Sequence, residues 1–232
     1  MLRKAIMPYV KQQTLRPTRG TIGAGVTHGK KGLISYALTT FDLGVPAAGT
    51  TTAVSTAVTG NNTTAVTTNL NYVLPVPRNI TVTAGGTAAS IAATAVVVTG
   101  KNIEGKTITD SLTPTAATAG TLVGTKIFHT VTGFTVPVQG GAGATFSVGL
   151  GDRFGINTRN LSVTQVRLVK KLVSTGVETL ATPATTNFST TLVEDNYVTL
   201  DATANGLNQY YLYAFNYNWQ LNPVNDNPNY GF

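Results

Sequence analysis

The sequence predicts an all-β protein whose body is an antiparallel β-sandwich, with an extended N-terminal arm and a C-terminal tail. Close to a fifth of the 232 residues are threonine. Threonine, valine, alanine and glycine dominate from residue 39 to 199, and β-branched side chains favour pleated strands over helices. The 24 glycines and 10 prolines supply turns at short spacing. No stretch of a dozen residues carries a helical apolar stripe free of Gly, Pro or a β-branched run.

The first expected strands lie between residues 33 and 110. Residues 33–38 form an apolar run that enters the body. Residues 80–84 alternate and end at Gly85 and Gly86, which signal a turn. Residues 90–99 finish in the apolar run 95–98, typical of a fully buried strand, and alternation resumes over 103–110.

Three further strands are expected between residues 126 and 170. Residues 126–136 alternate up to a bulge or bend near Gly133. Residues 145–150 place Phe146, Val148 and Leu150 on one face. Residues 161–170 carry apolar side chains on both faces, which indicates a bulged strand or one that passes from core to interface.

Strands at regular spacing with turns between them predict a sandwich of Ig-like or jelly-roll-like type rather than a parallel α/β sheet. Composition divides the chain into three regions. Residues 1–45 are expected to form a basic extended arm, 46–205 the β-sandwich body, and 206–232 an aromatic strand followed by an Asn/Pro-rich tail. The tail cannot form a helix or a central strand.

Positive charge is concentrated at the N-terminal end of the chain. Seven of the 16 basic residues precede the first acid, Asp42, and the other nine are balanced by nine acids. These seven residues are the predicted partner-binding positions: Arg3, Lys4, Lys11, Arg16, Arg19, Lys30 and Lys31. Such segregation predicts contact with a negative partner, either an acidic face of another subunit or nucleic acid. A randomly basic, solubilising terminus is the plainer alternative.

Aromatic residues gather near the C-terminal end, within residues 210–219. Because strand side chains alternate between faces, five aromatics share one face there: Tyr211, Tyr213, Phe215, Tyr217 and Trp219. Two interpretations stay open. This face packs in the core of a final strand, or it contacts another subunit or a ligand, because Tyr and Trp offer large contact areas with a polar tip.

Residue types that carry catalysis or bind metals are sparse. With no cysteine, thiolate chemistry, disulfides and Cys-ligated zinc are excluded. His28 and His129 have no partner at metal-ligand spacing, and Glu194 with Asp195 reads as a solvated turn rather than a glycosidase pair. Calcium on loop acids stays open. We therefore expect no enzyme activity, no catalytic or metal-binding residues and no cofactor.

No membrane association is expected from the sequence either. Its apolar runs fall short of the ~18 residues that a spanning helix needs. The first eight residues contain no apolar core of the length found in signal peptides, so Sec export is not expected.

The stretch from Arg78 to Ile156 resembles a module of tailed-bacteriophage structural proteins, often small capsid-associated ones. The resemblance lies in the order of turns and strands, over residues 78–83, 95–110, 123–137 and 145–155. It covers about a third of the chain and says nothing of the arm or the aromatic tail. It implies a β-sandwich built into a virion, with no enzymatic role.

Four functional hypotheses follow. The first is a capsid decoration or auxiliary (cement) protein, located in the virion as a homo-oligomer bound to the major capsid protein or other virion subunits. The second is a tail or head-tail connector protein, and the third an Ig-like module that recognises carbohydrate or a host surface. Direct binding of nucleic acid by the arm is the fourth and less favoured hypothesis.

Overall fold

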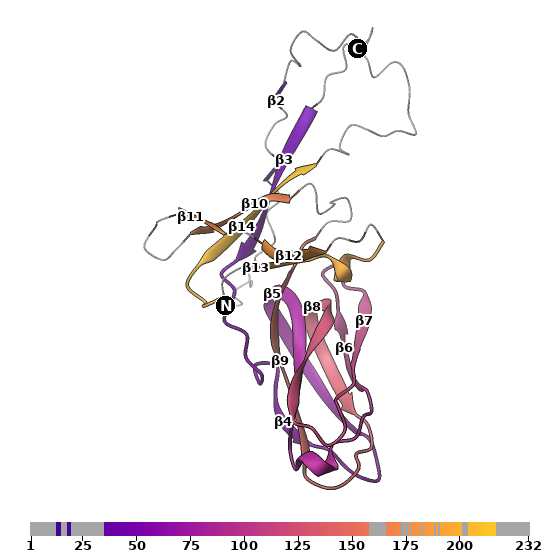
Figure 1. Ribbon diagram of the computed structural model, residues 1–232. Helices are drawn as coiled ribbons and strands as arrows, with labels where there is room; N and C mark the ends of the chain where they lie inside the picture. Colours follow the sequence, from indigo (N-terminus) through magenta and orange to yellow (C-terminus); the bar gives the residue numbers. More distant parts are fainter. Residues whose placement is uncertain are drawn as a thin grey trace, which may run out of the picture.

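The computed structural model describes residues 13–14, 18–19, 35–157, 166–172, 176, 178–181, 183–187, 189, 191–200 and 204–216. Within them all regular structure is β apart from two short 3₁₀ turns, η1 (Ala88–Ser90) and η3 (Val193–Asp195) (Figure 1). The strands are β1 (Gln13–Thr14), β2 (Thr18–Arg19), β3 (Ser35–Gly44), β4 (Ser55–Thr59), β5 (Val66–Gly86), β6 (Val96–Lys101), β7 (Thr107–Leu112), β8 (Gly120–Val136), β9 (Ala144–Gly155), β10 (Val166–Leu172), β11 (Glu178–Ala181), β12 (Pro183–Asn187), β13 (Tyr197–Leu200) and β14 (Gln209–Asn216).

The larger sheet has eight strands in the order β12-β13-β9-β5-β8-β6-β7, with β4 paired to β9. All its ladders are antiparallel. The long strands β5 and β8 form its spine, because they pair from Val66 opposite Val136 to Ala84 opposite Gly120. β9 lies along the second half of β5, whereas β6 lies along the second half of β8. The sheet can therefore curl until its two halves face each other across one core.

A bend in β5 produces this curl. Val73 pairs with Thr130 and Arg78 with Phe128, so the four residues 74–77 of β5 lie opposite the single residue His129 of β8. Two of the four are Pro75 and Pro77, which have no N–H to donate to a ladder. A bulge of this size bends the strand and increases its local twist. The prolines thus set the place at which the spine turns.

The first core fills the space inside the curled sheet. It takes the alternate, inward-facing residues of β5, β8 and β9, including Val82, Phe128, Phe134, Phe146 and Val148, each at most 1% exposed. The alternation predicted for residues 145–150 is present, because Phe146, Val148 and Leu150 all enter this core. The all-β class and the sandwich-like antiparallel architecture are confirmed.

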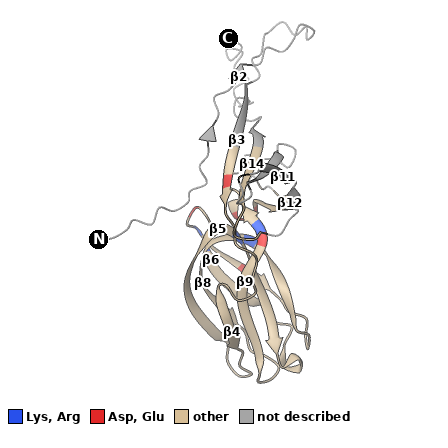
Figure 2. Ribbon diagram, turned by 90° about the vertical axis from the view of Figure 1, so that its left-hand side faces the viewer, with Lys and Arg blue, Asp and Glu red and all other residues tan. Residues whose placement is uncertain are grey.

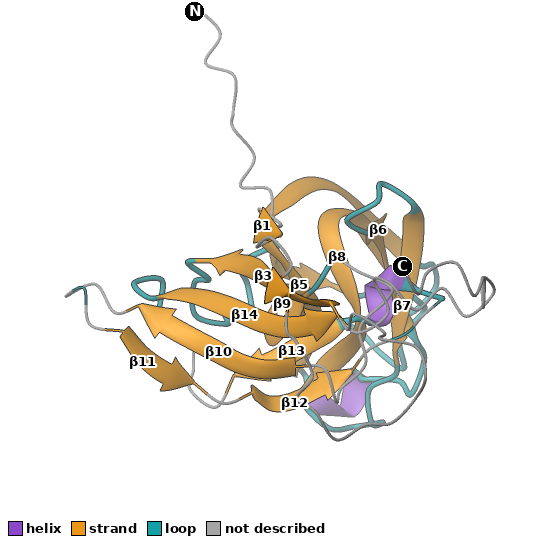
Figure 3. Ribbon diagram, turned by 90° about the horizontal axis from the view of Figure 1, so that it is seen from above, coloured by secondary structure: helices purple, strands orange, loops and turns teal. Residues whose placement is uncertain are grey.

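The smaller sheet has the order β1-β3-β14-β10-β11, with β2 also paired to β3. It lies at one end of the sandwich, where Figure 1 shows β3, β14 and β10 above the body and Figure 3 shows them from above. Its strands come from both ends of the chain. The predicted boundary at residue 45 falls directly after β3, so residues 35–44, which were assigned to the arm, form a strand of this sheet.

A second core joins the smaller sheet to the larger one. β3 and β14 contribute Phe41, Leu43, Tyr210 and Leu212. These pack against residues of β5, β9 and β13 and the segments that follow β9 and β13, namely Val76, Phe154, Ile156, Val198, Leu200 and Ala204. Val76 belongs to the proline bulge, so the bend that closes the first core also supplies a side chain to the second.

Candidate functional site

Most of the predicted partner-binding arm lies outside the described residues. This applies to Arg3, Lys4, Lys11, Arg16, Lys30 and Lys31. Arg19 belongs to β2, where its backbone pairs with Ser35, and β1 pairs with Thr39 and Thr40 of the same strand. Two short pieces of the basic N-terminal part of the arm, called the leader below, therefore pair with β3 as antiparallel strands. This places that part of the leader on the smaller sheet.

The aromatic strand is β14, and its core face is the even-numbered one. Tyr210 and Leu212 are fully buried in the second core, whereas Tyr211 and Tyr213 on the opposite face are partly exposed. The backbone of Phe215 pairs with Leu38, and Tyr217 and Trp219 lie outside the described residues. The two faces alternate as predicted, but the interpretation that the odd-numbered face packs in the core is wrong for Tyr211 and Tyr213, because Tyr210 and Leu212 fill the second core instead. Tyr211 and Tyr213 face away from the second core, so a contact role for them stays a prediction.

Arg78 in β5 ties three segments together where the two cores meet. Its side chain is 2% exposed, and the guanidinium donates to Gly151 O (2.5 Å), Ala47 O (2.8 Å) and Asp152 Oδ1 (3.1 Å). It also lies 4.8 Å from the centre of the Phe154 ring, at cation–π distance. Burial lowers the pKa of Arg78, and the nearby Asp152 carboxylate opposes that shift.

Nothing in the sequence pattern marked Arg78 as a buried hub. Isolated arginines are usually solvent-exposed, and the two carbonyls that it serves are backbone atoms with no sequence signature. Its position next to the proline bulge is the only signal that sequence reasoning could have used. The hydrogen bonds of Arg78 hold the segment at Ala47 and strand β9 against β5.

Asn79 and Arg153 make further polar contacts next to those of Arg78. Asn79 Nδ2 donates to Gly124 O (2.9 Å), and its Oδ1 accepts from the Arg153 backbone N–H (2.9 Å). A Cβ at Gly151 would lie 2.3 Å from Asn79 Oδ1, so only glycine fits there. The Arg153 guanidinium lies 4.9 Å from the centre of the Tyr197 ring in β13.

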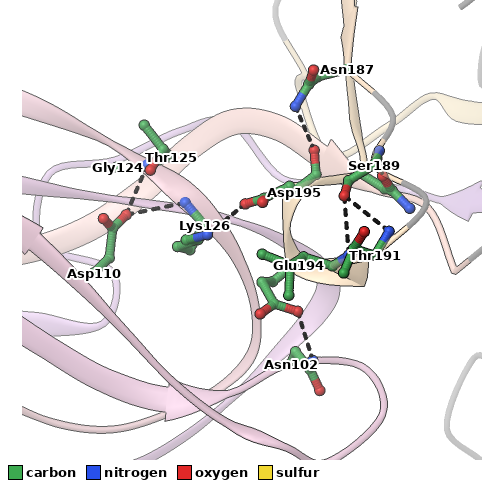
Figure 4. A network of polar contacts seen from close by, with 12 residues as sticks. Asn102, Asp110, Gly124, Thr125, Lys126, Asn187, Ser189, Thr191, Glu194 and Asp195 are labelled. Atoms are coloured by element: carbon green, nitrogen blue, oxygen red, sulfur yellow. Dashed lines mark hydrogen bonds and ion pairs between the residues drawn. The ribbon is translucent and has the colours of Figure 1, made fainter. Parts of the chain in front are cut away.

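The turn η3 is docked on the sandwich by two acidic side chains (Figure 4). Asp195 Oδ1 pairs with Lys126 Nζ of β8 at 2.7 Å, and Glu194 Oε2 accepts from Asn102 Nδ2 at 3.1 Å. Asp110 Oδ2 accepts from the backbone N–H of Lys126 (3.1 Å), which fixes the strand that presents this lysine. Glu194 and Asp195 thus join the body, rather than forming the solvated turn that the sequence suggested.

Glu194 is buried yet favours its charged form. Burial alone would raise the pKa of Glu194, but the opposing interactions lower it below the ordinary value. These are hydrogen bonds from its own backbone N–H and from Asn102, together with the positive charges of Lys106 and Lys126. The interactions of Glu194 with Asn102 and the nearby lysines are therefore stronger when its carboxylate is ionised.

His129 is half-buried opposite the proline bulge. Its Nδ1 is buried and has no hydrogen-bond partner among the described residues. Burial lowers the pKa of His129, so the neutral imidazole is favoured. Across the described residues, no three His, Asp or Glu side chains gather closely enough to hold a metal ion.

Charged residues are sparse over the sandwich and gather near its junction with the smaller sheet (Figure 2). Among the described residues, no helix has the length and apolar character to cross a bilayer. Within the described part of the chain, the largest group of polar side-chain contacts is thus at this junction, which is built from Arg78, Asn79, Arg153 and the docked turn η3.

Comparison with known proteins gives no relative: no family model, curated protein or solved structure matches this chain.

Proposed function

We propose that this chain is a non-enzymatic structural subunit of a tailed-bacteriophage virion, specifically a decoration or auxiliary subunit bound to the capsid. The observation that carries the proposal is the segregation of charge. Seven basic residues precede Asp42, while the remainder of the chain is neutral. A neutral sandwich with a cationic leader suits a subunit that attaches to an acidic shell surface through that leader.

The sandwich supplies a rigid body and the leader supplies the attachment. β1 and β2 pair with β3, so two leader segments start from a fixed edge of the smaller sheet. Attachment from a fixed edge loses less conformational entropy than attachment through a free chain. Area buried across capsomer boundaries would then oppose the outward pressure of packaged DNA.

Neutralising the leader tests this attachment. The variant changes Arg3, Lys4, Lys11 and Arg16 to Gln, which leaves β1 and β2 intact. A control that removes two charges changes Lys101 and Lys106, two exposed residues of the body, to Gln. We expect the leader variant to lose co-sedimentation with phage shells at moderate salt, while the control sediments as the wild type does.

Two results would overturn the proposal. Full occupancy of shells by the leader variant would show that the leader has no attachment role. Binding of the wild type to plain duplex DNA, with a steep loss of affinity as salt rises, would instead assign the leader to nucleic acid.

A further inference from the structure

A groove of about 270 Å³ lies on the outer face of the larger sheet. Thr81 in β5 sits opposite Val123 in β8 and Gly149 in β9, on the face away from the first core. Eleven residues line the groove: Gly49, Thr50, Thr51, Thr81, Thr121, Val123, Leu150, Gly151, Asp152, Arg153 and Thr199. The lining is thus rich in hydroxyl groups and carries one residue of each charge.

One wall of the groove is held rigidly in place. The segment 49–51 crosses β9, where Leu150 N donates to Thr50 O (2.8 Å) and Ser147 Oγ donates to Thr51 O (2.8 Å). A Cβ at Gly149 would lie 1.9 Å from Thr50 O, so this close crossing requires glycine. A wall fixed before binding lowers the entropic cost of taking a ligand.

The charged groups at one end of the groove are oriented by contacts made elsewhere. Asp152 is held by Arg78, yet its side chain remains 53% exposed. Arg153 is held over the Tyr197 ring and donates to Gly124 O at 3.3 Å. The Asp152 carboxylate supplies acceptors and the Arg153 guanidinium supplies donors, so the groove suits a ligand with hydroxyl groups, each of which both donates and accepts.

Thr81 supplies an unsatisfied polar group in the groove. Thr81 is 8% exposed, and its Oγ1 is buried without a hydrogen-bond partner in the described part of the chain. A buried hydroxyl without a partner costs folding free energy. The Thr81 side chain lines the groove while its hydroxyl is buried, so the hydroxyl can reach a ligand only by rotation to another χ1 rotamer.

We propose that this groove binds one unit of a neutral sugar. A sugar ring offers alternating hydroxyls to Thr81, Asp152 and Arg153, and its C–H face matches the exposed methyl groups of Val123. The volume is just below that of sites for drug-sized ligands, which fits a single ring. The inference rests on the groove alone and holds whether or not the chain is a capsid subunit.

Saturation-transfer NMR tests this site on the full chain. The probes are the methyl glycosides of glucose, galactose, mannose and N-acetylglucosamine. Val123→Phe fills the groove from an exposed position. Val73→Phe is the matched control, because Val73 is equally exposed at 55%, also lies in a strand and does not line the groove.

We expect transfer to at least one sugar with the wild type and with Val73→Phe, and loss of transfer with Val123→Phe. Two results overturn the inference: no transfer to any of the four probes with the wild type, or equal transfer with Val123→Phe.

Thr81→Val separates binding from folding. It replaces the buried hydroxyl by a methyl group of similar size, so we expect a melting temperature higher by about 2–4 °C. The same variant should bind the sugar at least tenfold more weakly. Unchanged sugar affinity in Thr81→Val would contradict a role for this hydroxyl in the groove.

Discussion

The sandwich and the smaller sheet are held together in different ways. Eighteen buried apolar residues form the first core, and all of them lie between Val54 and Leu150. Among the residues that the structure describes, the second core has ten, drawn from Phe41 through Leu212. The sandwich is therefore built from neighbouring strands, whereas the smaller sheet must bring β3 and β14 together from opposite ends of the chain.

Polar contacts also join β3 and the segment after it to β14 and the segment before it. Gln209 Nε2 donates to both carboxylate oxygens of Asp42, at 3.1 and 3.0 Å, and Gly206 N donates to Pro46 O at 2.9 Å. Bringing together residues so far apart in the sequence costs conformational entropy of the chain, which must be lost before the contacts can stabilise the fold. We therefore expect the sandwich to be the stable unit and the smaller sheet to depend on it.

Truncating one residue in each core gives the largest expected effects. Phe146→Ala should lower the unfolding free energy of the sandwich by about 3–5 kcal/mol, because it leaves a cavity in the first core. Leu212→Ala should instead open the smaller sheet first and leave the sandwich protected. Hydrogen exchange read by mass spectrometry distinguishes the two. Equal loss of protection in both regions for Leu212→Ala would show that the molecule unfolds as one unit.

Arg78→Met should give the next largest effect, a loss of about 2–3 kcal/mol. It leaves two backbone carbonyls, Gly151 O and Ala47 O, without their donor. Asp152→Asn is the matched control. Because Asp152 is half exposed, loss of its charge should cost less than about 1 kcal/mol. Urea denaturation measures both, and a larger loss for the aspartate variant would place the stabilisation in the ion pair instead.

The pH dependence of stability should give the smallest effect, in two acid windows. The pKa of His129 in the folded state lies below its ordinary 6.5, so stability is full above 6.5 and falls as the pH drops through the folded value. The pKa of Glu194 lies below its ordinary 4.5, so its contribution is present above 4.5 and is lost below it.

Single variants separate these windows in thermal unfolding measured across pH. Glu194→Gln should flatten the lower window, with a change of about 1 kcal/mol, and leave the upper one. His129→Leu should flatten the upper window only. An unchanged acid limb in Glu194→Gln would remove Glu194 from the docking of η3.

The sequence predicted the sandwich better than the junction, for a physical reason. Alternation records which face of a strand is buried, so residues 145–150 and 80–84 were placed correctly in β9 and β5. The strand expected over 90–99 was partly wrong, because β6 begins at Val96 and η1 ends at Ser90. Alternation cannot show that Ser90 instead anchors a turn, donating through Oγ to Ala142 O.

The junction depends on contacts between residues far apart in the sequence. Arg78 and Asp152, or Lys126 and Asp195, are separated by about seventy positions, and no local pattern pairs them. The alternation of β14 was predicted, but the even-numbered face is the core face, as the packing of Tyr210 and Leu212 on the second core shows. Periodicity gives two faces and does not say which one meets a neighbour.

The central proposal is that many copies of this chain decorate a capsid through the basic leader. Electron cryo-microscopy of the native particle tests it most directly. The proposal predicts sandwich-sized density repeated over the icosahedral shell, with the smaller sheet and the leader toward the capsid. Density confined to the tail or connector, or a particle without this chain, would contradict it.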